Sequence, residues 1–263
     1  MKDREKILRY FTATGEEAKD MAIRLLDLAD AVDRGRPFAV GPFMSPFAAQ
    51  VGQTIAAHAG TITAKSFGGY HEAERIKVAF VDGGYEGPVD FGIKLLSVKW
   101  DGRYRLIGHR DVLGSLMGLG IDRAVLGDIL MQENGCQILC DADMAQWIID
   151  NFHKVAMVTV TVEEVPMEEL HPPEKTAKEV RATVASLRLD AVGAAGFGLS
   201  RTKMVQLVDD QRTEGNWQMA KSASQAVKPG DVISGRGRGR IEIKEITGKS
   251  RKGRIGVLIE RYR

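Results

Sequence analysis

The chain has 263 residues, of which 44% are hydrophobic and 27% are charged, a composition typical of globular proteins with packed cores. No apolar run approaches the roughly 20 residues that span a membrane, and the charged start does not lead into a secretory signal, so a membrane protein is excluded and a cytoplasmic location is expected. The net charge of +2 conceals an asymmetry: residues 178–263 contain 18 Lys and Arg against 9 Asp and Glu, whereas the rest of the chain contains 19 against 26. A polyanion is therefore expected to bind the C-terminal third, although charge alone is equally consistent with simple solubility.

The first block of the chain, residues 1–74, predicts a small α/β domain. Apolar side chains recur at helical spacing over residues 15–32, and Gly35 and Pro37 end that pattern. A loop rich in Pro and Phe follows, and residues 47–58 form a second apolar stretch with helical spacing.

The second block, residues 75–165, alternates strand and helix patterns. The expected strands cover residues 76–81, 93–100, 127–130, 136–140 and 155–165, and the expected helices cover residues 110–119 and, with Asp143 as its cap, 144–152. This alternation predicts a split βαβ, ferredoxin-like sandwich, the fold of RNA-recognition-motif domains, and it gives an α+β protein of several domains. The fold by itself assigns no function.

The two cysteines, Cys136 and Cys140, fall on one expected strand, about 13 Å apart at the usual rise per residue. A disulfide needs Cα atoms within about 7 Å, so both thiols are expected to be reduced and buried. Neither the cysteines nor the five scattered histidines show the spacing of metal ligands, and no cofactor is expected.

Residues 166–181 contain adjacent prolines between Glu- and Lys-rich flanks and predict a polar linker, after which residues 182–263 form the basic third block. Leu187-Arg188-Leu189-Asp190 opens one expected helix, and Ser200 caps a second helix. The buried stripe of this second helix is expected to consist of Met204, Leu207 and Val208.

Four short motifs follow one another in this block: Arg-Leu-Asp at 188–190, Ser-Arg at 200–201, Asn at 216, and Gly-Asp-x-Ile at 230–233. Their order and spacing are similar to those of the RNA-binding domain of the ribosomal small-subunit protein-four type. The resemblance implies two short helices and a compact β-ribbon that together form a face for the RNA backbone.

The chemistry of the residues agrees with an RNA-backbone site. Arg188 and Arg201 stand at the edges of the apolar helix stripes, where a guanidinium can leave the core and bind a phosphate through two hydrogen bonds. Ser200 and Lys203 lie in the first turn of the second helix, whose N-terminus carries a partial positive charge. For any single arginine, the alternative to an RNA contact is a surface salt bridge. The four motifs in their order favour RNA binding for the domain.

Three further arginines, Arg236, Arg238 and Arg240, alternate with glycines just before an expected strand. Alternate residues of a strand share one face, so these arginines predict a basic ridge that RNA can approach closely. The alternative is a flexible, solvated Arg-Gly segment.

Signature strings outside the basic block extend the resemblance to nearly the whole chain. They are Gly68-Gly69-Tyr70 with Ala73-Glu74-Arg75, His109-Arg110-Asp111-Val112-Leu113-Gly114, Leu119-Gly120-Ile121-Asp122-Arg123, and Gly127-Asp128-Ile129. The chain thereby resembles the YlmH family of bacterial RNA-binding proteins. The resemblance implies a non-enzymatic protein of the cytoplasm that binds ribosomal RNA, tRNA or both on the large ribosomal subunit. It also implies a role in translation quality control on stalled peptidyl-tRNA.

The alternative function is an RNA-modifying enzyme, such as a pseudouridine synthase or a methyltransferase, with an appended RNA-binding domain. A synthase needs its catalytic Asp in a separate catalytic domain, whereas Arg188-Leu189-Asp190 lies inside the binding domain. A methyltransferase needs a glycine-rich loop after its first strand, which Val81-Asp82-Gly83-Gly84 only feebly suggests. His109-Arg110-Asp111 is not a kinase catalytic loop, because Leu116 stands where that loop requires Asn.

Overall fold

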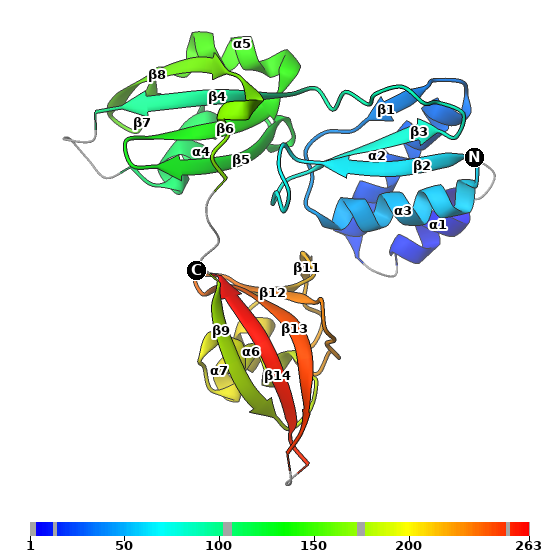
Figure 1. Ribbon diagram of the computed structural model, residues 1–263, viewed down its shortest axis with the longest axis vertical. Helices are drawn as coiled ribbons and strands as arrows, with labels where there is room; N and C mark the ends of the chain where they lie inside the picture. Colours follow the sequence, from blue (N-terminus) through cyan, green and yellow to red (C-terminus); the bar gives the residue numbers. More distant parts are fainter. Residues whose placement is uncertain (1–3, 13–14, 102–106, 173–176, 251–252, 263) are drawn as a thin grey trace. The chain divides into compact units, whose positions relative to one another are not determined.

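The computed structural model describes residues 4–12, 15–101, 107–172, 177–250 and 253–262 (Figure 1). Contacts divide the chain into two units, Met1–Pro173 and Glu174–Arg263. The start of the chain at residues 1–3, Gly102, and residues 173–176 of the predicted linker lie outside the described residues. None of the described helices is long and apolar enough to cross a membrane.

The first unit begins with an antiparallel sheet of three strands in the order β1 (Phe38–Val40), β3 (Lys77–Asp82), β2 (Ile62–Phe67). The helices of this part are α1 (Arg4–Thr12), α2 (Glu16–Asp33) and α3 (Phe47–Ala59), of which α2 and α3 confirm the two predicted helices. The predicted block boundary at residue 74 is wrong, because β3 pairs with both β1 and β2 and so belongs to the N-terminal sheet. As its central strand, β3 is almost fully buried.

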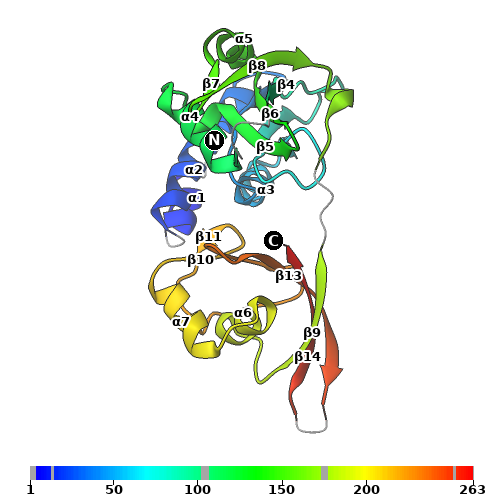
Figure 2. The ribbon, with the colours of Figure 1, turned by 90° about the vertical axis from the view of Figure 1, so that its left-hand side faces the viewer.

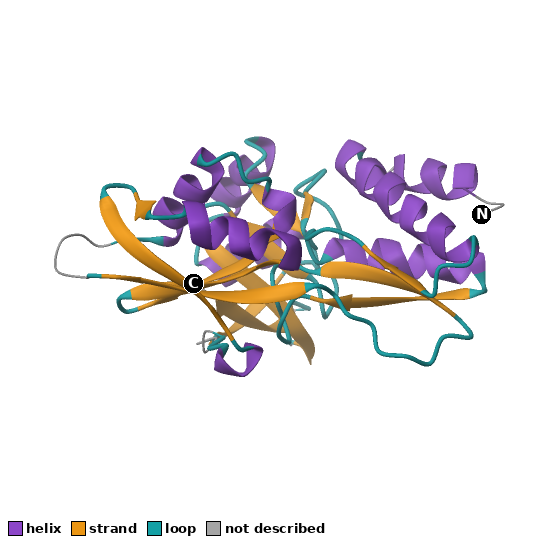
Figure 3. Ribbon diagram, turned by 90° about the horizontal axis from the view of Figure 1, so that it is seen from above, coloured by secondary structure: helices purple, strands orange, loops and turns teal. Residues whose placement is uncertain are grey.

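The ferredoxin-like sandwich follows, with strands in the order β5 (Leu126–Gln132), β6 (Gly135–Asp141), β4 (Ile93–Trp100), β8 (Val158–Val165), β7 (Lys154–Val155). All neighbouring strands are antiparallel, and the first long strand lies between the third and the fourth, as this fold requires. Helices α4 (His109–Gly118) and α5 (Ala142–Asn151) pack on one face over a core that includes Leu96, Val98 and Ile138. In Figure 3 the helices nearest the N-terminus, marked N, lie on one side of the strands beside them.

Two local predictions in this domain are corrected. Strand β6 runs directly into α5, so the helix starts at Ala142 and its cap is Asp141, whose side chain accepts a hydrogen bond from the Asp143 N–H, and not Asp143 itself. The predicted strand 155–165 is interrupted after β7 by a turn in which Ala156 adopts a positive φ of 51°.

At β6, the sheet face opposite α4 and α5 is covered by the chain itself. On β6, the Gln137 side chain donates to the Glu169 carbonyl (2.6 Å) and accepts from the His171 N–H (2.8 Å). Leu139 is buried, and a Cβ added at Gly69 would lie 2.8 Å from its side chain. Neither central strand, β4 nor β6, has an exposed aromatic side chain. The fold is that of an RNA-recognition motif, but on the face where such motifs stack bases the strand β6 is covered, whereas Lys99 and Glu163 beside it stay exposed.

The signature strings of the first unit meet where its two sheets join. Arg75 donates to the carbonyls of Phe43 (2.8 Å), Leu126 (2.8 Å) and Arg123 (2.9 Å), and burial lowers the pKa of its guanidinium to about 10. Asp128 accepts from the Tyr70 hydroxyl (2.7 Å) and the Glu74 N–H (2.7 Å), yet burial keeps the pKa of its carboxyl above the usual value. These contacts explain why the two sheets form one unit.

The second unit is a six-stranded antiparallel sheet with two helices on one face (Figure 2). The strands follow the order β11 (Gln218–Met219), β10 (Thr213–Gly215), β12 (Val232–Gly235), β13 (Gly239–Lys249), β14 (Ile255–Tyr262), β9 (Lys178–Val184). Helices α6 (Leu189–Phe197) and α7 (Arg201–Asp209) share a core with the sheet. The last residues of the predicted linker, 178–181, are part of β9, because β9 pairs with β14 along its whole length.

The two cysteines give the first experimental prediction. Both are free and buried, as predicted, and burial raises the pKa of each thiol to about 12. Because the thiolate is the reactive form, a thiol reagent such as 5,5′-dithiobis(2-nitrobenzoate) is expected to label native protein far more slowly than protein unfolded in guanidinium. Rapid labelling of both thiols in native protein would show that β6 is accessible and contradict the buried sheet.

Candidate RNA interface

The helix pair α6–α7 carries four of the seven predicted site residues. Gly198, in the left-handed conformation with φ 68°, ends α6. Only Leu199 separates it from Ser200, which caps α7 as predicted by accepting a hydrogen bond from the Lys203 N–H (3.3 Å). The short connection places the side chains of the first turn of α7 next to the body of α6.

A buried carboxylate organises the two predicted arginines. Asp190 in the first turn of α6 has a side chain only 3% exposed. Arg188 donates through Nε and Nη2 to its two oxygens (both 3.2 Å), and Arg201 donates through Nη2 to Oδ2 (2.6 Å). Burial alone would raise the pKa of Asp190, but the hydrogen bonds and charges of Arg201 and Arg188 outweigh it and hold that pKa below the usual value. We refer to Arg188, Asp190 and Arg201 as the Asp190 clamp.

The clamp leaves both guanidinium groups accessible. The side chain of Arg188 is 43% exposed and that of Arg201 is 53% exposed. An arginine has five N–H donors, so each keeps donors for a second acceptor after binding Asp190. Because the carboxylate fixes both heads, a phosphate bound there would cost little additional side-chain ordering.

The basic ridge predicted on one strand is wrong in its geometry. Arg236 and Arg238 lie in the turn that joins β12 to β13, where Gly237 and Gly239 adopt positive φ values of 76° and 86°. These conformations suit glycine and break the strand that the alternating pattern predicted. Both arginines are exposed, and within the described part of the chain neither forms an ion pair.

Arg240, the third arginine of the predicted ridge, lies on β13. Its neighbour Ile241 is fully buried and contacts α6 beside Gly196, so Arg240 points to the opposite face of the sheet. There it stands between Ser234 and Tyr262 in the strand register. The structure therefore does not bring Arg240 to the face formed by the helices.

The β12–β13 turn lies beside the end of α6. A Cβ added at Gly235 would lie 3.4 Å from the Phe197 ring, and the guanidinium of Arg261 stands 6.0 Å from the centre of that ring. The Arg236 N–H donates to the Arg212 carbonyl (2.9 Å). Sequence reasoning missed Arg212 and Arg261, because only the fold brings them to this corner, and it gave no role to Asp190.

The remaining motif residues brace the fold. Asn216, at a positive φ of 51°, donates to Asp231 (3.0 Å) and accepts from the Val232 N–H (2.9 Å). Asp231 also accepts from the Lys228 N–H (2.9 Å). These hydrogen bonds fix the start of β12, so Asn216 and the Gly-Asp pair stabilise the fold. Within the part of the chain that is described, no cluster of His, Cys, Asp and Glu could hold a metal ion.

Comparisons with known proteins agree with this arrangement. A family model described as "Putative RNA-binding domain in YlmH" matches residues 87–169, and the S4 domain model matches residues 187–233. Ribosome-associated protein quality control protein P2 of Bacillus subtilis (strain 168) is 34% identical over 198 residues, which cover 74% of this chain and 77% of the relative. The chain belongs to the YlmH family. The resemblance seen in the sequence is thereby confirmed.

A solved YlmH structure, the cell division protein ylmH from Streptococcus pneumoniae, is similar in fold, with a TM-score of 0.51 and 24% identity. It matches 60% of this chain and 96% of the solved chain. Within the YlmH architecture, the S4 match contains Arg188, Ser200, Arg201 and Lys203 but ends before the β12–β13 turn. The case for Arg236 and Arg238 therefore rests on their place in this structure.

Proposed function

We propose that this protein is a non-enzymatic, cytoplasmic RNA-binding protein that binds ribosomal RNA, tRNA or both on the large ribosomal subunit. Its role would be translation quality control on stalled peptidyl-tRNA complexes. The observation that carries the proposal is the Asp190 clamp, which presents two exposed, oriented guanidinium groups beside the N-terminus of α7. The name of the Bacillus subtilis relative, a ribosome-associated quality control protein, supports the setting.

The proposed RNA-binding face consists of the α6–α7 corner and the β12–β13 turn. It contains Arg188, Ser200, Arg201, Lys203, Arg236 and Arg238. Arg240 stays a weaker candidate, because it points to the other face of the sheet. The covered strand β6 and the absence of exposed aromatic side chains on β4 and β6 support binding mainly through the second unit, where the excess of positive charge lies.

The engagement of the two buried carboxylates among the described residues supports the proposal of a non-enzymatic protein. Asp128 is engaged by Tyr70 and the Glu74 backbone, and Asp190 is engaged by two arginines. Both carboxylates therefore have structural partners. Mass spectrometry of RNA incubated with the protein and S-adenosylmethionine is expected to show no change in mass, and a new methyl group would contradict the proposal.

Sedimentation with purified ribosomal subunits tests the setting. The full chain is expected to pellet with large subunits, more tightly when they carry peptidyl-tRNA, and to stay in the supernatant with small subunits. The comparison is made at two salt concentrations, because phosphate contacts weaken steeply as salt rises. Equal binding to both subunits and to unrelated RNA would refute a large-subunit role.

A further inference from the structure

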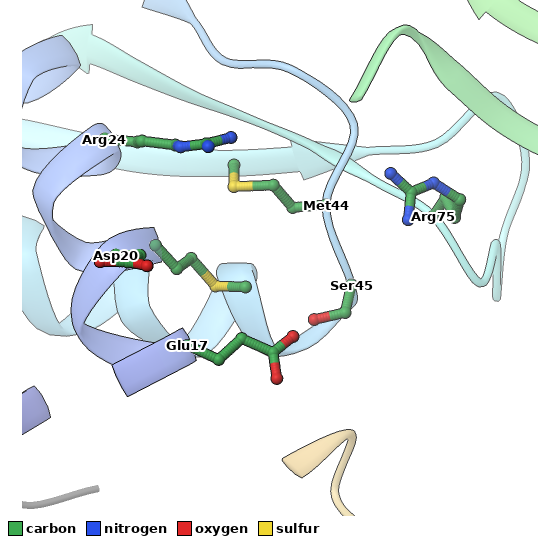
Figure 4. A pocket seen from close by; sticks show the side chains of 7 residues that line it. Glu17, Asp20, Arg24, Met44, Ser45 and Arg75 are labelled. Carbon is green, nitrogen blue, oxygen red and sulfur yellow. The ribbon is translucent and has the colours of Figure 1, made fainter. Parts of the chain in front are cut away.

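A pocket of the first unit lies between the N-terminal half of α2 and the chain at Met44, Ser45 and Arg75 (Figure 4). Its volume is about 480 Å³. Helix α2 contributes four side chains spaced by three or four residues, which therefore share one face: Glu17, Asp20, Met21 and Arg24. All lining residues of the pocket belong to the first unit, and none is part of the proposed RNA-binding face.

One wall of the pocket offers fixed donors. Arg75 is anchored through Nε and Nη2 to three backbone carbonyls, and its Nη1 makes no hydrogen bond with any described residue. Although burial lowers the pKa of Arg75 to about 10, the group stays charged at neutral pH. The Ser45 hydroxyl beside it is buried and has no hydrogen-bond partner among the described residues. An unpaired buried hydroxyl is costly, and a bound acceptor would relieve it.

The opposite wall is exposed and carries both charges, the carboxylates of Glu17 and Asp20 and the guanidinium of Arg24. Glu17 and Asp20 form no ion pair with the described residues, and Figure 4 shows the Glu17 carboxylate directed toward the Ser45 side of the space. Between the two walls lie Met21 and Met44, both mostly buried. The pocket thus combines guanidinium groups, carboxylates and a polarisable apolar surface.

We infer that this pocket binds a small zwitterion of the α-amino acid class. Its carboxylate would bind Arg75 Nη1 and Ser45, its ammonium group would bind Glu17 and Asp20, and its side chain would pack on Met21 and Met44. The two carboxylates and the two guanidinium groups, Arg24 and Arg75, give the lining no net charge, so a ligand that carries both charges matches it better than a phosphate or a plain cation. The volume fits a ligand of this size, since small-molecule sites usually enclose about 300–1,000 Å³.

Methionine-methyl NMR of the full chain tests the inference. With ¹³C-labelled methionine methyl groups, L-leucine is expected to shift the Met21 and Met44 signals saturably and to leave those of the distant Met157 and Met219 unchanged. L-leucinamide lacks the carboxylate and N-acetyl-L-leucine lacks the ammonium group, so each is expected to bind about tenfold more weakly. Inorganic phosphate is expected to shift neither signal.

Substitutions of the two carboxylates provide a second test of the inference. The double substitution Glu17→Gln/Asp20→Asn is expected to weaken L-leucine binding about tenfold, whereas Glu133→Gln, in the exposed β5–β6 turn, is expected to have no effect. The inference fails if L-leucine at about 10 mM moves neither Met21 nor Met44, a limit that corresponds to less than about 3 kcal/mol of binding. It also fails if the amide, the acetylated form or phosphate produces the same shifts as L-leucine, or if the double variant binds like the wild type.

Discussion

Replacing both Arg188 and Arg201 with alanine is expected to destabilise the second unit by about 3 kcal/mol, because it leaves a buried carboxylate without a partner. Asp190 has only 3% of its side chain exposed, and both of its ion pairs would be lost. Urea unfolding measures the loss, followed by tryptophan fluorescence in a Trp100→Phe/Trp147→Phe background, in which the signal comes from Trp217 of this unit. A loss of RNA binding in this variant would therefore not identify an RNA contact.

A triple variant separates the buried charge from the lost arginines. Adding Asp190→Ala to Arg188→Ala/Arg201→Ala removes the unpaired carboxylate and is expected to recover much of the stability. Lys203→Ala, an exposed neighbour, serves as the control and is expected to unfold like the wild type. The clamp would be contradicted if the double variant unfolded at the wild-type urea concentration.

The pH dependence follows from the direction of the Asp190 shift. In the wild type the arginines hold the pKa of folded Asp190 below its unfolded value of about 3.9, so the clamp stabilises fully above that pH and its contribution is lost as pH falls through the folded pKa. In the double alanine variant, burial raises that pKa instead. The variant is therefore expected to gain stability relative to the wild type on acidification from pH 7 to pH 5, and urea midpoints at the two pH values measure this difference.

A second triple variant, Lys203→Ala/Arg236→Ala/Arg238→Ala, tests the exposed part of the proposed RNA-binding face. It is expected to weaken binding to structured ribosomal RNA about a hundredfold at low salt. Because the three side chains are exposed and form no ion pair among the described residues, their loss is expected to leave the urea midpoint unchanged. The log–log slope of affinity against salt should fall by about two, as expected when about three phosphate contacts are removed. Filter binding over a range of salt concentrations measures both quantities.

The matched control removes the same charge from the first unit. Arg34, Arg36 and Lys65 are exposed there, and the variant with alanine at all three positions is expected to keep the affinity and the salt slope of the wild type. An equal loss in this control would mean that net charge, and not the proposed face, determines affinity.

Local sequence patterns predicted much of the architecture. Helical spacing located α2 and α3, and Ser200 was identified as the cap of α7 because capping depends on residues three positions apart. The domain of β3 could not be inferred in this way, because its place depends on pairing with residues 62–67, whose own strand pattern is weak. The covering of β6 likewise results from long-range contacts of Gln137 and Leu139.

The candidate site was predicted in part for similar reasons. The ordered strings placed Arg188 and Arg201 correctly at the two helix starts, but the sequence does not show that both grip the same carboxylate. The alternating arginines had the period of a strand, and the positive φ of Gly237 and Gly239 converts that stretch into a turn. Two arginines consequently stay near the helices, while Arg240 does not.

Ultraviolet crosslinking of the full chain to large ribosomal subunits, followed by mass spectrometry of the RNA-linked peptides, tests the central claim most directly. We expect crosslinks to concentrate in the second unit, in peptides that contain residues 187–203 and 234–239. Crosslinks confined to the first unit, with none in these peptides, would contradict the assignment of the RNA-binding face to the α6–α7 corner and the β12–β13 turn.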